Sequence, residues 1–202
     1  MVANIGRESL AALRLTLVLA VMCLIYAFAV TGVAQVAFHD QANGSLITKN
    51  GHVVGSKLIG QEFTDPKYFA GRPSATNADD GSKPQPYNAE NSAGSNLAPS
   101  NKVLIDRVSK AVEQIRKDNN LPADSLVPVD LVTADFTGFD PDISEAAALL
   151  QVDRVATARG LDPARVRQLV GSHVMGPDLG IFGEAHVNVL LLNMALDGGA
   201  AG

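Results

Sequence analysis

The residues best suited to bind an anion lie in the stretch Ser92–Asn101, which reads SAGSNLAPSN. Glycine, serine and asparagine crowd together just before a predicted helix, and free N–H groups at a helix N-terminus favour a phosphate. The chain contains neither the G-x-x-x-x-G-K-[ST] string of a P-loop nor the G-x-G-x-x-G dinucleotide pattern. Serine and asparagine before a helix more often form caps and turns. Local chemistry therefore favours a structural loop over a nucleotide site formed by Ser92, Gly94, Ser95 and Asn96.

Other residue types that could perform chemistry are scattered along the chain. The histidines are His39, His52, His173 and His186. They include no pair at the i, i+4 spacing that places two imidazoles on one helix face, and the G-x-S-x-G string of serine hydrolases is missing. Asp135, Asp140 and Asp142 are close in sequence, but acidic residues around such a turn are usually solvated. We therefore expect no catalytic residue and no metal ligand.

The apolar run from Leu15 to Phe38 is the clearest structural element. It holds 24 residues without a charge, and about 20 apolar residues suffice to cross the hydrocarbon core of a bilayer as a helix. A cleaved signal peptide is the alternative, because Gly32-Val33-Ala34 resembles a cleavage site, but signal peptides carry apolar regions of only about 7–15 residues. The sequence predicts a short N-terminus at 1–14, a transmembrane helix at 15–38 and a domain at 39–202.

Charge suggests how this anchor is oriented. Arg7 and Arg14 lie close before the apolar run, whereas Lys49 and Lys57 come well after it. This bias predicts a cytoplasmic N-terminus and an extracytoplasmic domain. Residues 39–202 carry 14 basic and 20 acidic side chains, a net charge of −6, which argues against nucleic acid as a partner. The only cysteine, Cys23, lies in the apolar run, so no disulfide framework is expected.

The first half of the predicted domain contains a hairpin and a long loop. Asn50-Gly51 between two apolar runs predicts a hairpin with strands near 45–48 and 52–54, with 58–59 extending the sheet. Asp65-Pro66 predicts one turn of helix over 66–70. Residues 71–100 predict a long ordered loop. Its sizeable apolar anchors are Tyr87 and Leu97.

The second half is predicted to be mainly helical. An amphipathic stripe indicates a helix over 102–117 that Asn101 or Ser100 caps, and β-branched residues predict a strand over 129–133. Further helices are expected from Ser144 to about Arg159, ended by Gly160, and from Asp162-Pro163 to about His173. Residues 187–197 fit either a strand or a short helix capped by Asn188, and we predict the helix. Early strands and late helices indicate a single α+β domain.

Several strings resemble a known family. They are NGSLI (43–47), LIGQEF (58–63), YFAGRPSAT (68–76), YN (87–88), GSNLAPSN (94–101), VPVDLVTA (127–134), RVATARGL (154–161) and VNVLLLNMALD (187–197). In the same order and with similar spacing, they resemble the C subunit of the Kdp potassium-transporting ATPase. Two places depart from the family pattern. Ala93 stands where a second glycine is common, and Asp135-Phe136 replaces small residues.

The resemblance implies a non-catalytic, accessory subunit of a four-part inner-membrane pump. Its implied partners are a potassium-selective channel-like subunit, a P-type ATPase subunit, a small single-span subunit and membrane lipid. The chain lacks the DKTG motif that a P-type ATPase phosphorylates, so it is not the motor. The implied role is assembly and stabilisation, with ATP acting through the ATPase subunit, whose nucleotide affinity this family is proposed to raise. Ser92–Asn101 also resembles the signature loop of ABC transporters, yet an exported loop would not meet cytoplasmic ATP.

The matched strings also supply the residues that the resemblance implies for the fold or for an interface. These are Gln61, Arg72, Pro73, Ser74, Tyr87, Asn88, Asn101, Asp130, Thr133, Ser144, Gln151, Arg154, Asn188 and Asn193. Two other protein classes remain as alternatives, a membrane-anchored exported hydrolase and an exported solute-binding module.

Overall fold

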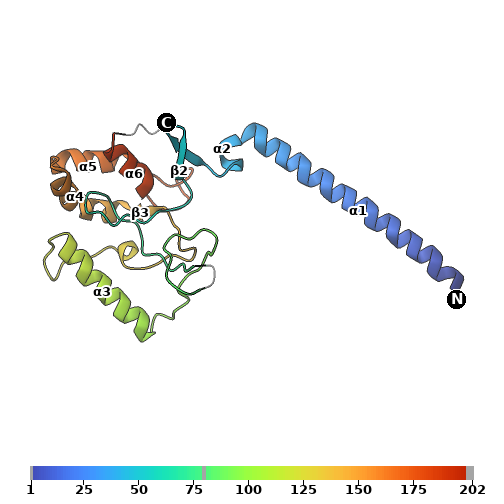
Figure 1. The fold of residues 1–202 in the computed structure, drawn as a ribbon, viewed down its shortest axis with the longest axis horizontal. Helices are drawn as coiled ribbons and strands as arrows, with labels where there is room; N and C mark the ends of the chain where they lie inside the picture. The colour runs from blue at the N-terminus through green and yellow to red at the C-terminus, as the bar shows by residue number, and fades with distance from the viewer. Residues whose placement is uncertain (1, 79–80, 199–202) are drawn as a thin grey trace. The chain divides into compact units, whose positions relative to one another are not determined.

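The computed structural model describes residues 2–78 and 81–198, in two compact units that divide after Leu46 (Figure 1). The first unit consists of the long helix α1 (Val2–Ala37) and the short helix α2 (His39–Ala42). Within α1, the stretch Gly6–Ala37 is long and apolar enough to cross a membrane, and it is not buried in the protein. The predicted apolar helix is therefore confirmed, and helical backbone extends it toward the N-terminus.

The predicted hairpin is confirmed as β1 (Leu46–Lys49) and β2 (His52–Ser56). Asn50 and Gly51 have φ angles of 53° and 79°, and two consecutive left-handed residues are what a tight type I′ turn requires. The expected extension at 58–59 is reduced to an isolated bridge between Ser56 and Ile59.

A second, three-stranded antiparallel sheet lies at the centre of the domain. Its strands follow the order β3 (Asp142–Ser144), β5 (His186–Asn188) and β4 (Val174–Met175). Val187 occupies the middle, paired with Ile143 on one side and Val174 on the other. All three strands come from the second half of the chain, so the expectation that strands gather early is only partly right. The α+β class itself is confirmed.

Helices α4 (Glu145–Arg159), α5 (Pro163–Ser172) and α6 (Val189–Leu196) pack with this sheet to form the core. Helix α3 (Lys102–Asp118) is the fourth helix of the domain among the residues described (Figure 1). The core comprises Phe69, Leu131, Ile143, Ala147, Ala148, Val152, Val155, Ala156, Val166, Val170, Val187, Val189 and Leu192.

Side-chain caps begin these helices where the sequence predicts them. Asn101, Ser144, Asp162 and Asn188 each accept a hydrogen bond from a backbone N–H of the first turn that follows. Gly160 ends α4 with a left-handed φ of 64°. The stretch 187–197 contains both candidate structures, because strand β5 leads directly into α6. The predicted helix is thus confirmed, and the strand just before it was missed.

Two predicted elements are wrong. Residues 129–133 form no strand, because Val129–Leu131 is a short 3₁₀ turn, η1, and the Val132 N–H donates to the Val129 carbonyl at 3.1 Å. Thr133 Oγ1 donates to the same carbonyl at 2.7 Å. Residues 66–70 form no helix. The Asp65 carboxylate accepts from the Lys67 N–H at 3.0 Å, as a cap would, but other side chains capture the backbone groups that a helix would use.

The described part of the predicted loop, residues 71–78 and 81–100, forms no helix, and residues 79 and 80 lie outside the described residues. Its described residues contain only an isolated bridge, between Asn77 and Pro84.

Candidate functional site: a side-chain clamp and a stapled loop

Two amide side chains hold the segment Pro66–Ala70, which belongs to no helix or strand. Asn193 of α6 accepts from the Phe69 N–H at 2.8 Å and donates to the Phe69 carbonyl at 2.9 Å. Gln151 of α4 does the same for Ala70, at 2.8 and 3.1 Å. Both amides are almost fully buried, and so is Phe69. Each amide offers a donor and an acceptor in the geometry of a peptide group. The two side chains therefore bond this segment as the backbone of a neighbouring strand would.

Arg154 completes the clamp, a name we use for Gln151, Arg154 and Asn193. Its Nη1 donates to the carbonyls of Pro66 and Tyr68 at 2.6 and 3.0 Å. Its Nη2 and Nε donate to Gln151 Oε1 and to Asn119 Oδ1 at 2.6 and 3.1 Å. Burial lowers the pKa of Arg154 from its ordinary value, yet these acceptors match the fork of a guanidinium that stays charged. The clamp binds the protein's own backbone.

Arg159 extends the clamp, and sequence reasoning missed it. Its Nε donates to the Lys67 carbonyl at 2.7 Å, and its Nη2 pairs with Asp197 at 2.8 Å. The guanidinium lies over the Tyr68 ring at 4.8 Å, and the Tyr68 hydroxyl donates to Asp197 at 2.9 Å. Its place on α4, the same partly buried helix as Arg154, was the available signal, because a charge on a buried helix needs partners.

Tyr87 pins the start of the loop 71–100. Its hydroxyl donates to the Arg72 carbonyl at 2.6 Å. Its ring lies against two glycines, since a Cβ on Gly60 would approach Tyr87 Cε1 to 2.5 Å and a Cβ on Gly71 would approach the hydroxyl to 2.6 Å. Burial, with a smaller effect of nearby carboxylates, raises the pKa of Tyr87, which keeps the hydroxyl a donor. Arg72 also pairs with Asp140 at 3.0 Å, half-buried.

Hydroxyl groups organise the middle of the same loop. Ser74 Oγ donates to the Gly138 carbonyl at 2.5 Å and accepts from the Tyr87 N–H at 2.9 Å. Thr76 Oγ1 accepts from the Asn88 N–H at 3.1 Å. Asn88 is buried, and its side chain donates to the Asn77 carbonyl at 2.9 Å. Thr76 was not singled out from the sequence, although it lies in the matched string YFAGRPSAT.

The anion-loop candidate Ser92–Asn101, which we call the stapled loop, lies on the turn 135–138. Ser92 Oγ and the Ala93 N–H both donate to the Thr137 carbonyl, at 3.2 and 3.1 Å. A Cβ on Gly94 would lie 3.3 Å from Phe136 Cα. The φ of Gly94 is not left-handed, so this glycine serves to let its backbone approach the backbone of Phe136 closely. The Ala93 N–H is already occupied and so is not free to bind an anion.

The rest of the stapled loop prepares helix α3. Asn96 adopts a left-handed φ of 50°, which asparagine tolerates better than most residues. Ser95 is half-buried, and Asn101 Oδ1 accepts from the Val103 N–H at 2.8 Å. Beneath the loop, the Asp135 carboxylate accepts from the N–H groups of the turn. Its negative charge disfavours a phosphate at this place.

The remaining motif residues join elements of the domain. Asp130 accepts from the Ser144 N–H at 2.6 Å, which ties η1 to the start of α4. Asn188 donates to the Lys57 carbonyl at 3.0 Å, and Gln61 donates to the Val54 carbonyl of β2 at 2.7 Å.

The remaining titratable candidates do not converge on one site. No group of three His, Cys, Asp or Glu side chains suited to a metal ion occurs among residues 2–78 and 81–198. His186 Nε2 lies 3.8 Å from Asp142, whose pKa is raised by burial. These two, with Asp140, line a cavity of about 470 Å³. A smaller one, of about 350 Å³, lies beside Pro73 and Tyr87.

Comparison with known proteins agrees with this pattern of motifs. The family described as K+-transporting ATPase, c chain, matches residues 9–198. A protein of Rhodopseudomonas palustris (strain BisB5) named Potassium-transporting ATPase KdpC subunit is 54% identical over 197 residues, covering 95% of this chain and 96% of the relative. A protein of the same name from Bradyrhizobium diazoefficiens is 52% identical, covering 96% and 98%. This chain therefore belongs to the family of the K+-transporting ATPase c chain.

Proposed function

We propose that this chain is a non-catalytic, accessory subunit of an ATP-driven potassium uptake complex. It stabilises a channel-like subunit and a P-type ATPase subunit, together with a small single-span subunit. The main support is that motif side chains form hydrogen bonds within the domain itself. Gln151, Arg154 and Asn193 all bond the protein's own backbone, so their task is to shape a rigid domain. Family membership favours this role over an exported hydrolase or a solute-binding module.

The orientation is part of the proposal. Arg7 and Arg14 flank the start of the apolar run, which supports a cytoplasmic N-terminus and a periplasmic domain. A reporter enzyme active only outside the cytoplasm, fused after Gly202, is expected to be active. A silent exported reporter beside an active cytoplasmic one would reverse this orientation.

We also propose that ATP acts on this chain only through the ATPase subunit. The occupied Ala93 N–H and the Asp135 carboxylate beneath the stapled loop support this. Calorimetry with the purified full chain in detergent is expected to show no saturable ATP binding at millimolar nucleotide. Micromolar binding that Gly94→Val abolishes, without loss of fold, would instead assign Ser92, Gly94, Ser95 and Asn96 to a nucleotide site.

The assembly role has a direct test. The affinity-tagged full chain is purified from membranes in mild detergent, and its companions are identified and quantified. We expect the channel-like and ATPase subunits in fixed proportion, and potassium uptake that depends on this chain. A chain that purifies alone from cells whose pump is active would contradict the proposal.

A further inference from the structure

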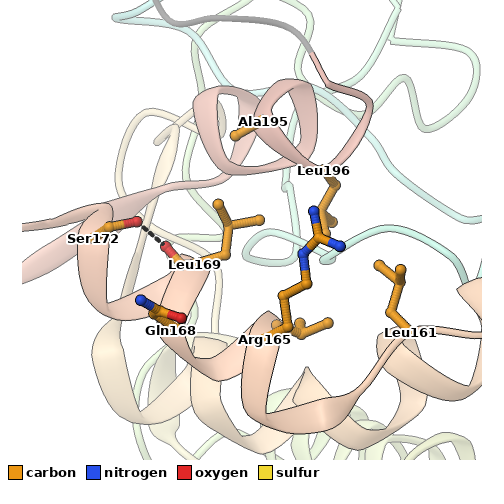
Figure 2. Close-up of a pocket in the computed structure, with 8 residues that line it drawn as sticks. Leu161, Arg165, Gln168, Leu169, Ser172, Ala195 and Leu196 are labelled. Atoms are coloured by element: carbon orange, nitrogen blue, oxygen red, sulfur yellow. Dashed lines mark hydrogen bonds between the residues drawn. The ribbon is translucent and has the colours of Figure 1, made fainter.

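A cavity of about 380 Å³ opens between α5, α6 and the turn that precedes α5. Figure 2 shows Arg165 of α5 at its centre, extending between Leu161 and Leu169 toward Leu196 of α6. This volume lies within the range of sites that bind small groups, about 300–1,000 Å³. The lining residues are Leu161, Arg165, Val166, Gln168, Leu169, Ser172, Ala195 and Leu196.

The Arg165 guanidinium differs from the other arginines discussed above. Arg72 and Arg159 each pair with a carboxylate, and Arg154 is saturated by carbonyl and amide oxygens. Among the residues that the structure describes, no carboxylate, carbonyl or amide oxygen bonds the Arg165 side chain. Asp197, just beyond α6, is already bonded to Arg159. The cavity therefore presents an unneutralised cation between leucine side chains.

We propose that this cavity docks a segment of another pump subunit that carries a carboxylate side chain beside an aliphatic one. The inference builds on the proposed function, because it supplies a docking point for the assembly role. Charge complementarity selects the carboxylate, since Arg165 supplies the charge among the residues that line the cavity. The leucine walls select the aliphatic neighbour, because Leu161, Leu169 and Leu196 line the same cavity as Arg165 and offer apolar surface to bury.

A lipid headgroup fits these observations less well. Residues 39–202 carry a net charge of −6, so the domain as a whole is repelled by an anionic bilayer surface. A protein segment brings its carboxylate to Arg165 without bringing a sheet of further negative charges.

Photocrosslinking identifies the occupant. A benzoylphenylalanine residue replaces Gln168, which lines the cavity, in the full chain within its native membrane. Arg167, on the same helix but outside the lining, carries the probe in the control. We expect the Gln168 probe to crosslink to a peptide of another subunit that contains Asp or Glu next to Leu, Ile or Val, and the control to crosslink at least about fivefold less. A crosslink to a phospholipid, to a second copy of this chain, or to nothing would overturn the proposal.

Charge reversal measures what the contact contributes. In the tagged full chain, Arg165→Glu is expected to lower the recovery of the other subunits at least about fivefold, whereas Arg167→Glu leaves recovery unchanged. Both side chains are exposed, and unchanged thermal unfolding of each purified chain confirms that neither variant acts through misfolding. Normal recovery with Arg165→Glu would overturn the docking site alone. A wild-type chain that recovers no other subunit would overturn the proposed function, and the docking site with it.

Discussion

The segment held by the clamp and the stapled loop both lie outside any helix or sheet, and they are held by opposite means. The clamp uses buried amides on α4 and α6, each making two bonds to one residue, as Asn193 does with Phe69. The stapled loop uses the single Thr137 carbonyl, which accepts from Ser92 Oγ and the Ala93 N–H near the surface. In the clamp, water has little access to the bonds. In the stapled loop, water competes for each of them.

This difference determines how rigid each of the two regions is. Leaving a buried hydrogen-bonding group without a partner costs free energy, so the clamp fixes one conformation of the segment that it holds. Exposed bonds exchange with water at little net cost, so the stapled loop keeps its shape mainly through close packing at Gly94. We expect damage to the clamp to unfold the domain, and damage to the stapled loop to alter its surface.

The largest effect is expected from Asn193→Ala. The substitution leaves the Phe69 N–H and carbonyl without partners in a buried place. Each unsatisfied group costs about 1–3 kcal/mol, so we expect a loss of about 3 kcal/mol in the free energy of unfolding. Urea unfolding of the full chain in detergent measures it.

Asn91→Ala is the matched control for this change, because Asn91 also bonds two groups, the Asn77 and Ala78 carbonyls, but outside the core. Its expected loss is below about 1 kcal/mol. Equal losses for the two asparagines would show that a buried amide of the clamp stabilises the domain no more than an amide outside the core.

Gly94→Val is expected to act next most strongly. A side chain there meets Phe136 Cα and carbonyl oxygen at 3.3 Å, and overpacking of this kind costs about 1–3 kcal/mol. Recovery of partner subunits should fall while the helical circular dichroism of the chain is preserved. Gly171→Val on α5, where a Cβ meets nothing within 4 Å, should leave both unchanged. Lost helical signal in Gly94→Val would place the stapled loop in the rigid core.

Asn101→Ala should have a smaller effect, about 1 kcal/mol, because it removes the side-chain cap of α3. Ser100→Ala is the control, since Ser100 is the exposed neighbour and does not cap the helix. Hydrogen exchange of the amides 102–105 reports local fraying. Faster exchange throughout α4 as well would mean that the two regions are coupled.

The smallest effect is expected on the pH dependence of the free energy of unfolding. Burial alone would raise the pKa of Asp197, but hydrogen bonds from Arg159 and Tyr68 outweigh it and hold the pKa below its ordinary 3.8. The stability from this carboxylate is therefore present above that ordinary value and is lost as the pH falls through the lowered one. Asp197→Asn should flatten the decline in unfolding free energy between pH 5 and pH 3, estimated from linkage. Asp153→Asn, an exposed change on α4, should leave the slope as it is.

Local chemistry was enough to predict the helices and the hairpin. Asn50-Gly51, Ser144 with Gly160, and Asp162-Pro163 each specify backbone angles or caps without help from distant residues. Tyr87 was also found, because an aromatic side chain within a polar loop needs a buried place. These predictions depend on residues at most a few positions apart.

The clamp could be anticipated only through the resemblance, which singled out Gln151, Arg154 and Asn193 without assigning their contacts. Asn193 meets a partner 124 residues earlier in the chain, and no sequence periodicity encodes such a pairing. The wrong helix over 66–70 follows from the same cause, since the local signals were present but distant side chains took the backbone groups. The strands β3 and β4 are too short for their alternation to be visible.

The position of β5 in the chain has a consequence for the order of events during synthesis. Its residue Val187 pairs with both outer strands, and Asn193 follows shortly after it. A ribosome makes the chain from the N-terminus, so the outer strands emerge before β5, and Phe69 emerges before Asn193. The hairpin of β1 and β2 can form earlier, but the three-stranded sheet and the Asn193 bonds to Phe69 cannot form until residues 186–193 have been made. Folding of this core during synthesis must therefore wait for its last segment, because its pairings join residues far apart in the sequence.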